Sequence, residues 1–296
     1  MNNILLADEW KDYELIDSAN GEKLERWGQY ILRRPDGQAI WPLVQNDSNW
    51  ENADAVYTRS TTGGGFWKFK KQIDERWIIG YKNLKFFVEP TGFKHTGLFP
   101  EQAVNWDWMM EKILNVNNKN SGRRMKVLNL FGYTGAASVA CSVAGADVVH
   151  VDASKGMNMW AKENYDLNYK NGVGEVRFIT DDVKKFVQRE IRRGNKYDGI
   201  IMDPPVYGRG PKGELWEIEK EIGPLIQNCS ELLTDKSLFL IVNSYTASFS
   251  HIALANVLNN VVYQQYRGNI VSGEIGIKAR KSGVILPCGL YGKWYS

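Results

Sequence analysis

The sequence is poor in the residues that build disulfide frameworks and histidine-based metal centres. It has only 3 Cys and 3 His among its 296 residues. The three cysteines, Cys141, Cys229 and Cys288, lie far apart and form no CxxC pair. A disulfide-stapled fold and a zinc cluster are therefore not indicated, and we expect no metal site.

Long apolar runs are also absent. None approaches the roughly 20 residues that a membrane-spanning helix needs, and Asp8 and Glu9 interrupt the first stretch too early for a signal peptide. We therefore expect a cytoplasmic protein with no membrane contact. Charge of neither sign dominates: the net charge of +3 permits a nucleic-acid partner without demanding one.

The first part of the chain, residues 1–90, has short apolar–polar alternations separated by turn signals such as Asn20-Gly21 and Pro35-Asp36-Gly37. These patterns predict antiparallel hairpins, so we expect a small β-rich domain that is a candidate RNA-binding module. Strands are expected at 66–70 and 77–88, the first with lysines forming a basic face over an aromatic core. Residues 91–124 are predicted to be a connecting helix, about 101–115, followed by a loop.

In residues 125–296 the sequence pattern changes, and short apolar strands alternate with helices. This alternation predicts a parallel sheet covered on both faces. The expected strands are 126–131, 147–151, 176–179, 197–202 and 237–243, and the expected helices are 135–144, 154–171, 181–193, 215–233 and 249–258. Two final strands, 263–271 and 283–294, have only a loop between them, so the last should run antiparallel.

Ligands of such sheets bind at the carboxyl ends of the strands. The first expected strand contains Asn129 and runs into Phe131-Gly132-Tyr133-Thr134-Gly135. Glycines there let a ligand approach the backbone. Because the GxGxxG spacing is absent, an uncharged or zwitterionic group is favoured over a pyrophosphate. An ordinary tight turn explains the segment equally well.

Acidic residues follow the next two strands. Asp152, ahead of Ala153 and Ser154, can accept hydrogen bonds from both hydroxyls of a ribose, and capping of the next helix is the alternative. After the third strand come Asp181 and Asp182. We assign Asp182 to an adenine amino group and expect Asp181 to cap the helix.

The fourth strand end carries the most specific signal, Asp203-Pro204-Pro205-Val206-Tyr207-Gly208-Arg209-Gly210. Two prolines rigidify the chain and leave the Asp203 carboxylate and the Pro204 carbonyl as fixed acceptors. Such acceptors suit an amino group on a planar base, on which Tyr207 can stack. Asn243 and Tyr245, after the fifth strand, can flank the same pocket or cap the strand end.

The order of these motifs resembles class I S-adenosylmethionine (SAM)-dependent methyltransferases and, more narrowly, the bacterial large-subunit (23S) ribosomal RNA methyltransferase group. The resemblance implies an α/β, Rossmann-like fold with a seven-stranded sheet and a small β-rich N-terminal domain. It also implies that SAM is the cofactor and that the strand-end residues named above, Asp203 included, hold it. The stretch from Lys94 to Gln102 is similar to that group's Thr-Gly-x-Phe…Asp-Gln-Arg segment, which abuts the SAM site and adds Thr96; here Glu101 and Ala103 replace Asp and Arg.

One departure bears on the reaction. Members that methylate cytosine C5 resemble one another in a Cys after the fifth strand, and here that stretch is Ile241-Val242-Asn243-Ser244-Tyr245-Thr246. We therefore expect methylation of a ribosomal RNA base at nitrogen without a covalent Cys intermediate, with Asp203, Pro204, Pro205 and Tyr207 as the catalytic group. The basic loop from Lys278 to Lys281 is a candidate for phosphate contacts.

Other functions remain open from the sequence. They are a methyltransferase acting on a protein or a small molecule, a catalytically idle SAM-fold binding module and, more distantly, a nucleotide-dependent oxidoreductase. The exposed strand edges of a β-rich domain also make a homodimer plausible.

Overall fold

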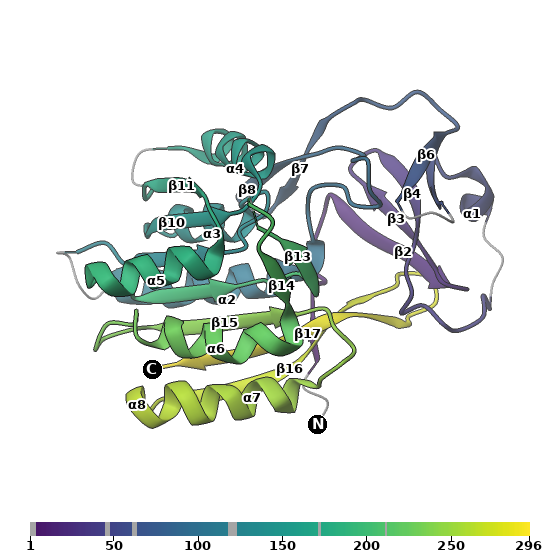
Figure 1. Ribbon diagram of the computed structural model, residues 1–296. Helices are drawn as coiled ribbons and strands as arrows, with labels where there is room; N and C mark the ends of the chain where they lie inside the picture. Colours follow the sequence, from purple (N-terminus) through teal and green to yellow (C-terminus); the bar gives the residue numbers. More distant parts are fainter. Residues whose placement is uncertain (1–3, 45–47, 61–63, 118–122, 171–172, 211) are drawn as a thin grey trace. The chain divides into compact units, whose positions relative to one another are not determined.

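The computed structural model describes residues 4–44, 48–60, 64–117, 123–170, 173–210 and 212–296 (Figure 1). Most of the loop predicted before residue 125 lies outside these ranges. The chain forms two compact units. Unit 1 comprises Met1–Ile4, Asn105–Glu274 and Gly289–Ser296, and unit 2 comprises Leu5–Val104 and Ile275–Cys288. The sequence predicted domain boundaries at residues 90 and 124, which differ from the limits of these two units. The predicted domains stay a prediction.

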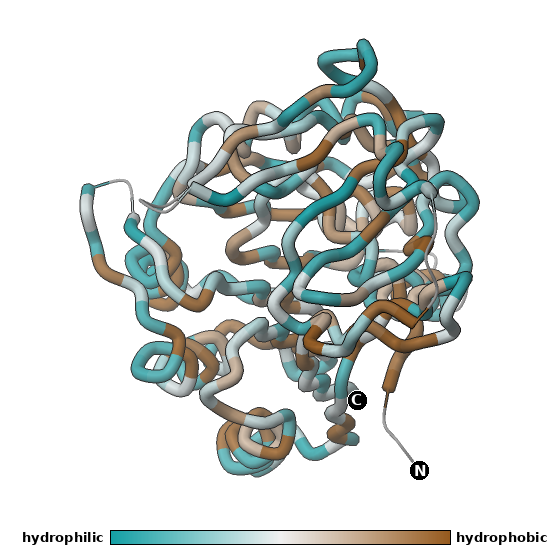
Figure 2. Tube along the Cα trace, turned by 90° about the vertical axis from the view of Figure 1, so that its right-hand side faces the viewer, coloured by the Kyte–Doolittle hydropathy of each residue, from teal (hydrophilic) through white to brown (hydrophobic). Residues whose placement is uncertain are grey.

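The large sheet has eight strands in the order β1-β16-β17-β15-β12-β9-β10-β11. They are β1 (Ile4–Leu6), β9 (Lys126–Leu130), β10 (Asp147–Asp152), β11 (Val176–Thr180), β12 (Gly199–Met202), β15 (Phe239–Ser244), β16 (Asn269–Lys278) and β17 (Ile285–Tyr295). β9, β10, β11, β12 and β15 pair in parallel, and β17 runs antiparallel to β15, as the sequence predicted. The seven expected strands are joined at the edge by β1, the short hydrophobic stretch beside the N mark in Figure 2.

Helices precede β9 and connect the strands that follow it. They are η1 (Pro100–Gln102), α2 (Ala103–Asn117), α3 (Ala136–Val143), α4 (Lys155–Asn168), α5 (Val183–Arg193), α6 (Ile218–Ser230), α7 (His251–Leu258) and α8 (Gln264–Tyr266). α5 shows why they begin and end where they do. Asp182 caps its first turn, and Gly194 ends it in the left-handed region with φ 68°. Apolar residues of α5, α6 and α7 share one core with the sheet, and Figure 1 shows these helices side by side.

Two elements predicted from the sequence, at residues 215–233 and 263–271, differ from the structure. The helix expected at 215–233 begins with a strand, β14 (Leu215–Glu217), which pairs with β13 (Tyr207–Arg209). The strand expected from residue 263 starts only at Asn269, because α7 continues through a π-helical stretch, Asn259–Tyr263. Val262, within the π-helical stretch, is fully buried in the core shared with the sheet. Tertiary packing thus overrides local propensity.

Unit 2 contains an antiparallel-rich sheet in the order β2-β3-β4-β5-β6. Its elements are β2 (Tyr13–Ala19), β3 (Glu22–Trp27), β4 (Tyr30–Pro35), α1 (Ser48–Asn52), β5 (Ala55–Arg59) and β6 (Gly65–Phe69). The single strand predicted at 77–88 is a hairpin, β7 (Trp77–Tyr81) and β8 (Leu84–Val88), that turns at Lys82 with φ 52°. The aromatic core predicted under the lysines of β6 was also wrong, since Phe66 and Phe69 are 60% and 52% exposed.

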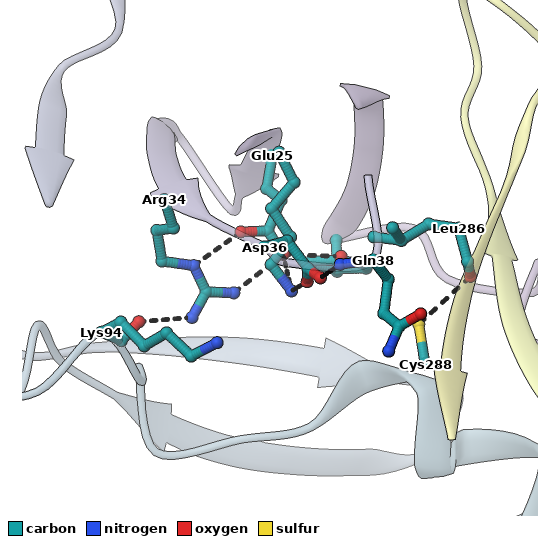
Figure 3. A network of polar contacts seen from close by, with 9 residues as sticks. Glu25, Arg34, Asp36, Gln38, Lys94, Leu286 and Cys288 are labelled. Atoms are coloured by element: carbon teal, nitrogen blue, oxygen red, sulfur yellow. Dashed lines mark hydrogen bonds and ion pairs between the residues drawn. The ribbon is translucent and has the colours of Figure 1, made fainter. Parts of the chain in front are cut away.

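A buried ion pair holds the middle of unit 2 together (Figure 3). The Arg34 guanidinium donates to both carboxylate oxygens of Glu25 at 2.7 and 2.8 Å and to the Lys94 carbonyl at 2.8 Å. The Tyr13 hydroxyl donates to the same carboxylate at 2.8 Å. Burial opposes ionisation of Glu25, but the charges of Arg34 and Lys23 together with the hydrogen bonds from Arg34 and Tyr13 outweigh it and lower the pKa of Glu25 to about 2. The pair also ties β3 and β4 to the segment that precedes Thr96.

The described helices include none that is both long and apolar enough to cross a bilayer. Figure 2 agrees, since hydrophobic stretches along the trace are short and interrupted by hydrophilic residues.

Candidate functional site

The turn after β9 has an unusual backbone. Phe131, Tyr133 and Gly135 all have positive φ values of 57°, 51° and 83°. Two of these residues are not glycine, and such conformations cost free energy that the surroundings must offset. The turn therefore holds a fixed shape at the carboxyl edge of the sheet, as expected of a binding loop.

The buried side chain of His150 packs against this turn. A Cβ added to Gly132 would lie less than 3.0 Å from three ring atoms of His150. The His150 ring is fully buried and shares a hydrogen bond of 2.9 Å with the Ser138 hydroxyl, which also accepts from Asn129 at 2.8 Å. Burial lowers the pKa of His150 to about 3, so the ring is neutral. Gly132 thus makes room for a side chain of this protein, and close approach of a ligand to it stays a prediction.

Gly135 and Asn129 also make contacts within the protein. A Cβ on Gly135 would meet the Ala161 side chain at 2.8 Å, so this glycine lets α4 pack closely. The Asn129 side chain is buried and points to Ser138. Thr134 is also buried, and its carbonyl accepts from Asn164 at 2.8 Å. Contact of these residues with a cofactor stays a prediction.

Asp152 lies at the end of β10, beside the turn. One carboxylate oxygen accepts from the Tyr133 N–H at 2.9 Å and the other from the Ser154 N–H at 2.8 Å. The cap of α4 is Ser154, whose hydroxyl accepts from Met157 N–H. A carboxylate has about four acceptor positions, so each Asp152 oxygen can still accept one hydrogen bond. Burial raises the pKa of Asp152. This geometry suits two neighbouring hydroxyl groups, and Ala153 lies within the same short link to α4.

Asp181 does not cap α5 as the sequence suggested, and Asp182 takes that role. Asp182 is the helix cap, because it accepts from the Lys185 N–H at 2.9 Å. Asp181 instead forms an ion pair with Arg189 on α5. The second oxygen of Asp182 lies next to Gly210, where an added Cβ would be 2.9 Å away. Capping therefore leaves Asp182 one oxygen for a ligand.

The segment after β12 carries Asp203 and the two prolines into the β13–β14 hairpin. The Trp216 indole N–H donates to the Pro205 carbonyl at 2.7 Å, and its ring lies 4.8 Å from that of Phe131. No described group donates to the Pro204 carbonyl. The hairpin is also tied to α5, because Lys185 pairs with Glu214. This pairing lowers the pKa of Glu214 to about 2.

The end of β15 brings one further group to Asp203. The Tyr245 hydroxyl donates to an Asp203 carboxylate oxygen at 3.4 Å. Asn243, predicted alongside it, is buried and accepts from Asn105 of α2 at 3.0 Å. Tyr245 therefore belongs with the acceptor group, whereas Asn243 supports the sheet edge. Tyr207 lies on β13 and is 56% exposed.

The thiols lie where the sequence placed them. Cys141 is inside α3 and Cys229 inside α6, and both are buried. Burial raises the pKa of both thiols, which keeps them protonated and poor nucleophiles. Cys288, in β17, belongs to unit 2.

Thr96 belongs to unit 2 as well, and its predicted role stays a prediction. Its side chain is fully buried and its carbonyl accepts from the Glu89 N–H at 3.2 Å. In the same segment, burial raises the pKa of Glu101, the residue that stands where the resembling group has Asp.

A model of the family described as S-adenosylmethionine-dependent methyltransferase matches residues 66–246, more than half of the chain. The chain belongs to the SAM-dependent methyltransferases. Its cofactor is accordingly SAM, and its reaction is methyl transfer. The matched range includes the turn after β9, Asp152 and Asp203.

Solved structures of methyltransferases share the fold. The SAM-dependent methyltransferase from Agrobacterium tumefaciens is 38% identical with a TM-score of 0.91, over 99% of this chain and 93% of that one. A putative SAM-dependent methyltransferase from Streptococcus mutans is 16% identical with a TM-score of 0.73, over 98% and 76%.

Curated methyltransferases match a smaller part. The ribosomal RNA large subunit methyltransferase K/L of Shewanella frigidimarina is 31% identical over 179 residues, which are 59% of this chain and 24% of that protein. The protein of the same name from Hahella chejuensis is 31% identical over 54% of this chain and 21% of its own length. The chain thus spans about a quarter or less of the curated relatives cited.

The residues at the sheet edge fit SAM by their donors and acceptors. Asp152 offers two remaining acceptor positions to the ribose diol, and Asp182 offers one oxygen to an amino group. The rigid turn with its positive φ values offers backbone groups to the amino-acid end.

Sequence reasoning missed two residues that shape the methyltransferase site. Trp216 was assigned to a helix, although an aromatic residue shortly after Gly210 and Gly213 could have indicated a hairpin that folds back. Asn158 donates to the Asp152 carbonyl at 3.1 Å and to the Thr180 hydroxyl at 3.0 Å, joining the ends of β10 and β11. Nothing in the local sequence distinguishes it from a surface asparagine.

Proposed function

We propose that this methyltransferase modifies a base of ribosomal RNA at a nitrogen atom. The observation that carries the proposal is the acceptor group at the end of β12. There the Pro204 carbonyl has no donor among the described residues, and the neighbouring Asp203 carboxylate is contacted by the Tyr245 hydroxyl. Two adjacent acceptors match the two N–H bonds of an amino group.

These residues act mainly by positioning. The Pro204 carbonyl and the Asp203 carboxylate accept the two amino hydrogens, which turns the nitrogen lone pair away from them. Pro205 is held by Trp216, so the acceptors cannot swing out of place. Tyr207 presents an exposed ring on which the base can stack. SAM, when bound, supplies an electrophilic methyl group on a sulfonium with a good leaving group. Alignment of this kind can contribute about 7–11 kcal/mol.

A nitrogen acceptor is favoured over carbon because no cysteine follows β15 and both helical thiols are buried. Methylation at C5 of a pyrimidine through a covalent intermediate needs a thiolate in the site. Tyr245, which contacts Asp203, has no comparable nucleophilicity at neutral pH.

RNA is favoured as the substrate by the names of the curated relatives and by one surface of unit 2. Phe66 of β6 is 60% exposed, and the exposed Lys68 lies two residues further along the strand, so the two side chains share one face. Exposed rings beside cations are the combination that binds single-stranded nucleic acid. A ribosomal RNA substrate also places the protein in the cytoplasm. A homodimer stays a prediction from the sequence.

Mass spectrometry of ribosomal RNA nucleosides from cells with and without this gene tests the proposal. One nitrogen-methylated nucleoside should disappear and return when the wild-type gene is restored. Asp203→Ala should fail to restore it, whereas Asp235→Ala, at an exposed position of unit 1, should restore it fully. Unchanged nucleosides, together with a methylated protein or metabolite, would move the substrate to that class.

A further inference from the structure

Trp216 of β14 is a buried side chain that contacts both halves of the candidate site. It is 6% exposed and belongs to the core that the helices share with the large sheet. Its ring centroid lies 4.8 Å from that of Phe131, and its indole N–H donates to the Pro205 carbonyl at 2.7 Å. Phe131 begins the turn that the sequence assigns to the cofactor, and Pro205 ends the segment assigned to the methyl acceptor. All three residues belong to unit 1.

The two contacted segments leave neighbouring strands of the sheet. β9 and β12 pair in parallel with Leu130 beside Met202, so Phe131 and Asp203 follow their strands at the same edge. The Asp203 N–H donates to the Leu130 carbonyl at 3.4 Å. A side chain that contacts both segments beyond this edge therefore helps to set the distance between the cofactor and the acceptor.

On the cofactor side, the ring contact accompanies a strained backbone. Phe131 has a φ of 57°, a left-handed conformation that costs free energy in a residue with a Cβ. Such conformations persist only where the surroundings hold them, and they cluster at functional sites. The contact with Trp216 is one such restraint, because aromatic pairs at this spacing attract each other. Trp216 thus helps to fix the shape of the turn.

On the acceptor side, Pro205 is held from two directions. Trp216 donates to its carbonyl, and Gly208, which lies opposite Trp216 in the hairpin, would place an added Cβ 3.3 Å from Pro205 Cγ. The Pro204 carbonyl and the Pro205 nitrogen share one planar peptide unit, and the ring of Pro205 fixes its φ. Holding the Pro205 carbonyl therefore limits the directions in which the Pro204 carbonyl can point.

The strand that carries Trp216 is anchored away from these contacts. The Lys184 ammonium of α5 donates to the Leu215 carbonyl at 3.3 Å. The Ile218 N–H donates to the Val206 carbonyl at 3.0 Å. The backbone is thus restrained on both sides of Trp216, so the indole can restrain Phe131 and Pro205.

We propose that Trp216 is a positioning residue that makes the placement of the methyl acceptor depend on the bound cofactor. The inference rests on the proposed function, because it takes the Pro204 carbonyl as an acceptor of the target amino group. Cofactor bound at the turn restrains Phe131, the ring contact restrains Trp216, and the indole N–H restrains Pro205. Methyl transfer needs this alignment, since a misplacement of about 1 Å can cost roughly a hundredfold in rate.

Hydrogen–deuterium exchange of the full chain with and without S-adenosylhomocysteine (SAH) tests this link in the absence of any acceptor. In the wild type, SAH should slow exchange of the amides of residues 206–208 by about tenfold. Trp216→Phe keeps an aromatic ring but loses the indole N–H, so SAH should still bind while its effect on these amides disappears. Phe131→Leu removes the ring contact from the cofactor side and should also abolish the effect, so it provides the same test if Trp216→Phe does not fold.

Trp294→Phe is the matched control. Trp294 is 1% exposed in the same core, and its indole N–H also donates to a backbone carbonyl, that of Arg267. It lies opposite Leu240, near the amino end of β15 and away from the candidate site. Thermal melting should show that both variants lose stability, whereas the effect of SAH on residues 206–208 should persist in Trp294→Phe.

Steady-state methylation of ribosomal RNA from cells that lack the gene separates positioning from folding. Trp216→Phe should lower kcat about tenfold or more and change the KM for SAM less than about twofold, because the lost bond acts on the acceptor segment. Trp294→Phe should keep the wild-type kcat. A purely structural role of Trp216 predicts similar kinetics for the two folded variants.

Absence of the SAH effect in the wild type, or its survival in Trp216→Phe, would overturn the inference. So would an unchanged kcat in Trp216→Phe, or a fall in kcat that Trp294→Phe shares. The two proposals fail separately. Amide protection that depends on Trp216 in a protein that methylates no RNA refutes the proposed function alone. Ribosomal methylation that proceeds at the wild-type rate in Trp216→Phe refutes the positioning role alone.

Discussion

Lys293 on β17 is a buried cation whose removal should stabilise unit 1. The side chain is 2% exposed, and its ammonium lies 4.8 Å from the Trp108 ring centroid and 4.9 Å from that of Tyr291. The described residues offer it no carboxylate. Burial lowers the pKa of Lys293 from 10.5 to about 7, although the two rings favour the ammonium.

The shift sets the size and the sign of a pH effect. Between about pH 7 and pH 10, the unfolded chain holds a proton on this lysine that the folded chain has released. The loss of folding stability caused by burying the charged ammonium is therefore largest below pH 7, and it shrinks as the pH rises through that window. A shift of this size corresponds to about 4 kcal/mol at pH 7 and about 2 kcal/mol at pH 9.

Lys293→Met removes the charge while keeping most of the side-chain volume. Urea unfolding should show the variant to be about 2–4 kcal/mol more stable than wild type at pH 7, and about 2 kcal/mol of that gain should disappear at pH 9. Comparing each variant with wild type at the same pH cancels the titration of distant groups. Lys236→Met, at an exposed position, should show a similar difference at both pH values. A Lys293→Met protein that is less stable at pH 7, or whose advantage does not shrink, would refute the reasoning.

Three further substitutions probe other features. Gly132→Ala should lose about 1–3 kcal/mol of stability in urea because the new Cβ meets the His150 ring, whereas Gly37→Ala, with open space around it, should change little. Asp152→Ala should weaken binding of S-adenosylhomocysteine about a hundredfold by calorimetry, since two charge-assisted bonds to the ribose are lost; a change under threefold would contradict the diol assignment. Glu25→Gln should cost about 3–5 kcal/mol by leaving a buried arginine short of its counter-charge. The stability that ionised Glu25 contributes should be complete above about pH 4.5 and be lost as the pH falls to 2. A wild-type protein whose stability shows no such loss in acid would contradict this prediction.

Much of unit 1 was predictable because its signals are local. Each strand of the parallel sheet is a short apolar run, and each site residue follows directly after such a run. Asp152 and Asp203 could therefore be placed at one edge from the strand positions alone. The antiparallel direction of β17 followed from the absence of a helix between the last two strands.

The failures involve contacts that a turn or strand makes outside its own segment. The role of Gly132 depends on His150, which local composition does not reveal. The strand at Leu215–Glu217 depends on pairing with Tyr207–Arg209, which only the glycines between them signal. The π-helical continuation of α7 likewise depends on burial of Val262 in the core, which no propensity encodes.

Both compact units are discontinuous along the chain, and this sets the order in which they can be completed during synthesis. Ile275–Cys288 returns to unit 2 after Asn105–Glu274 has been made. The residues Lys281 and Ser282 therefore leave the ribosome some 170 residues after the rest of their unit has emerged. At about 5–20 residues per second, unit 2 stays incomplete for roughly 10–30 seconds of translation. A nascent chain stalled before residue 275 should lack the segment that completes unit 2 and also the last segment of unit 1, Gly289–Ser296, which pairs with β15.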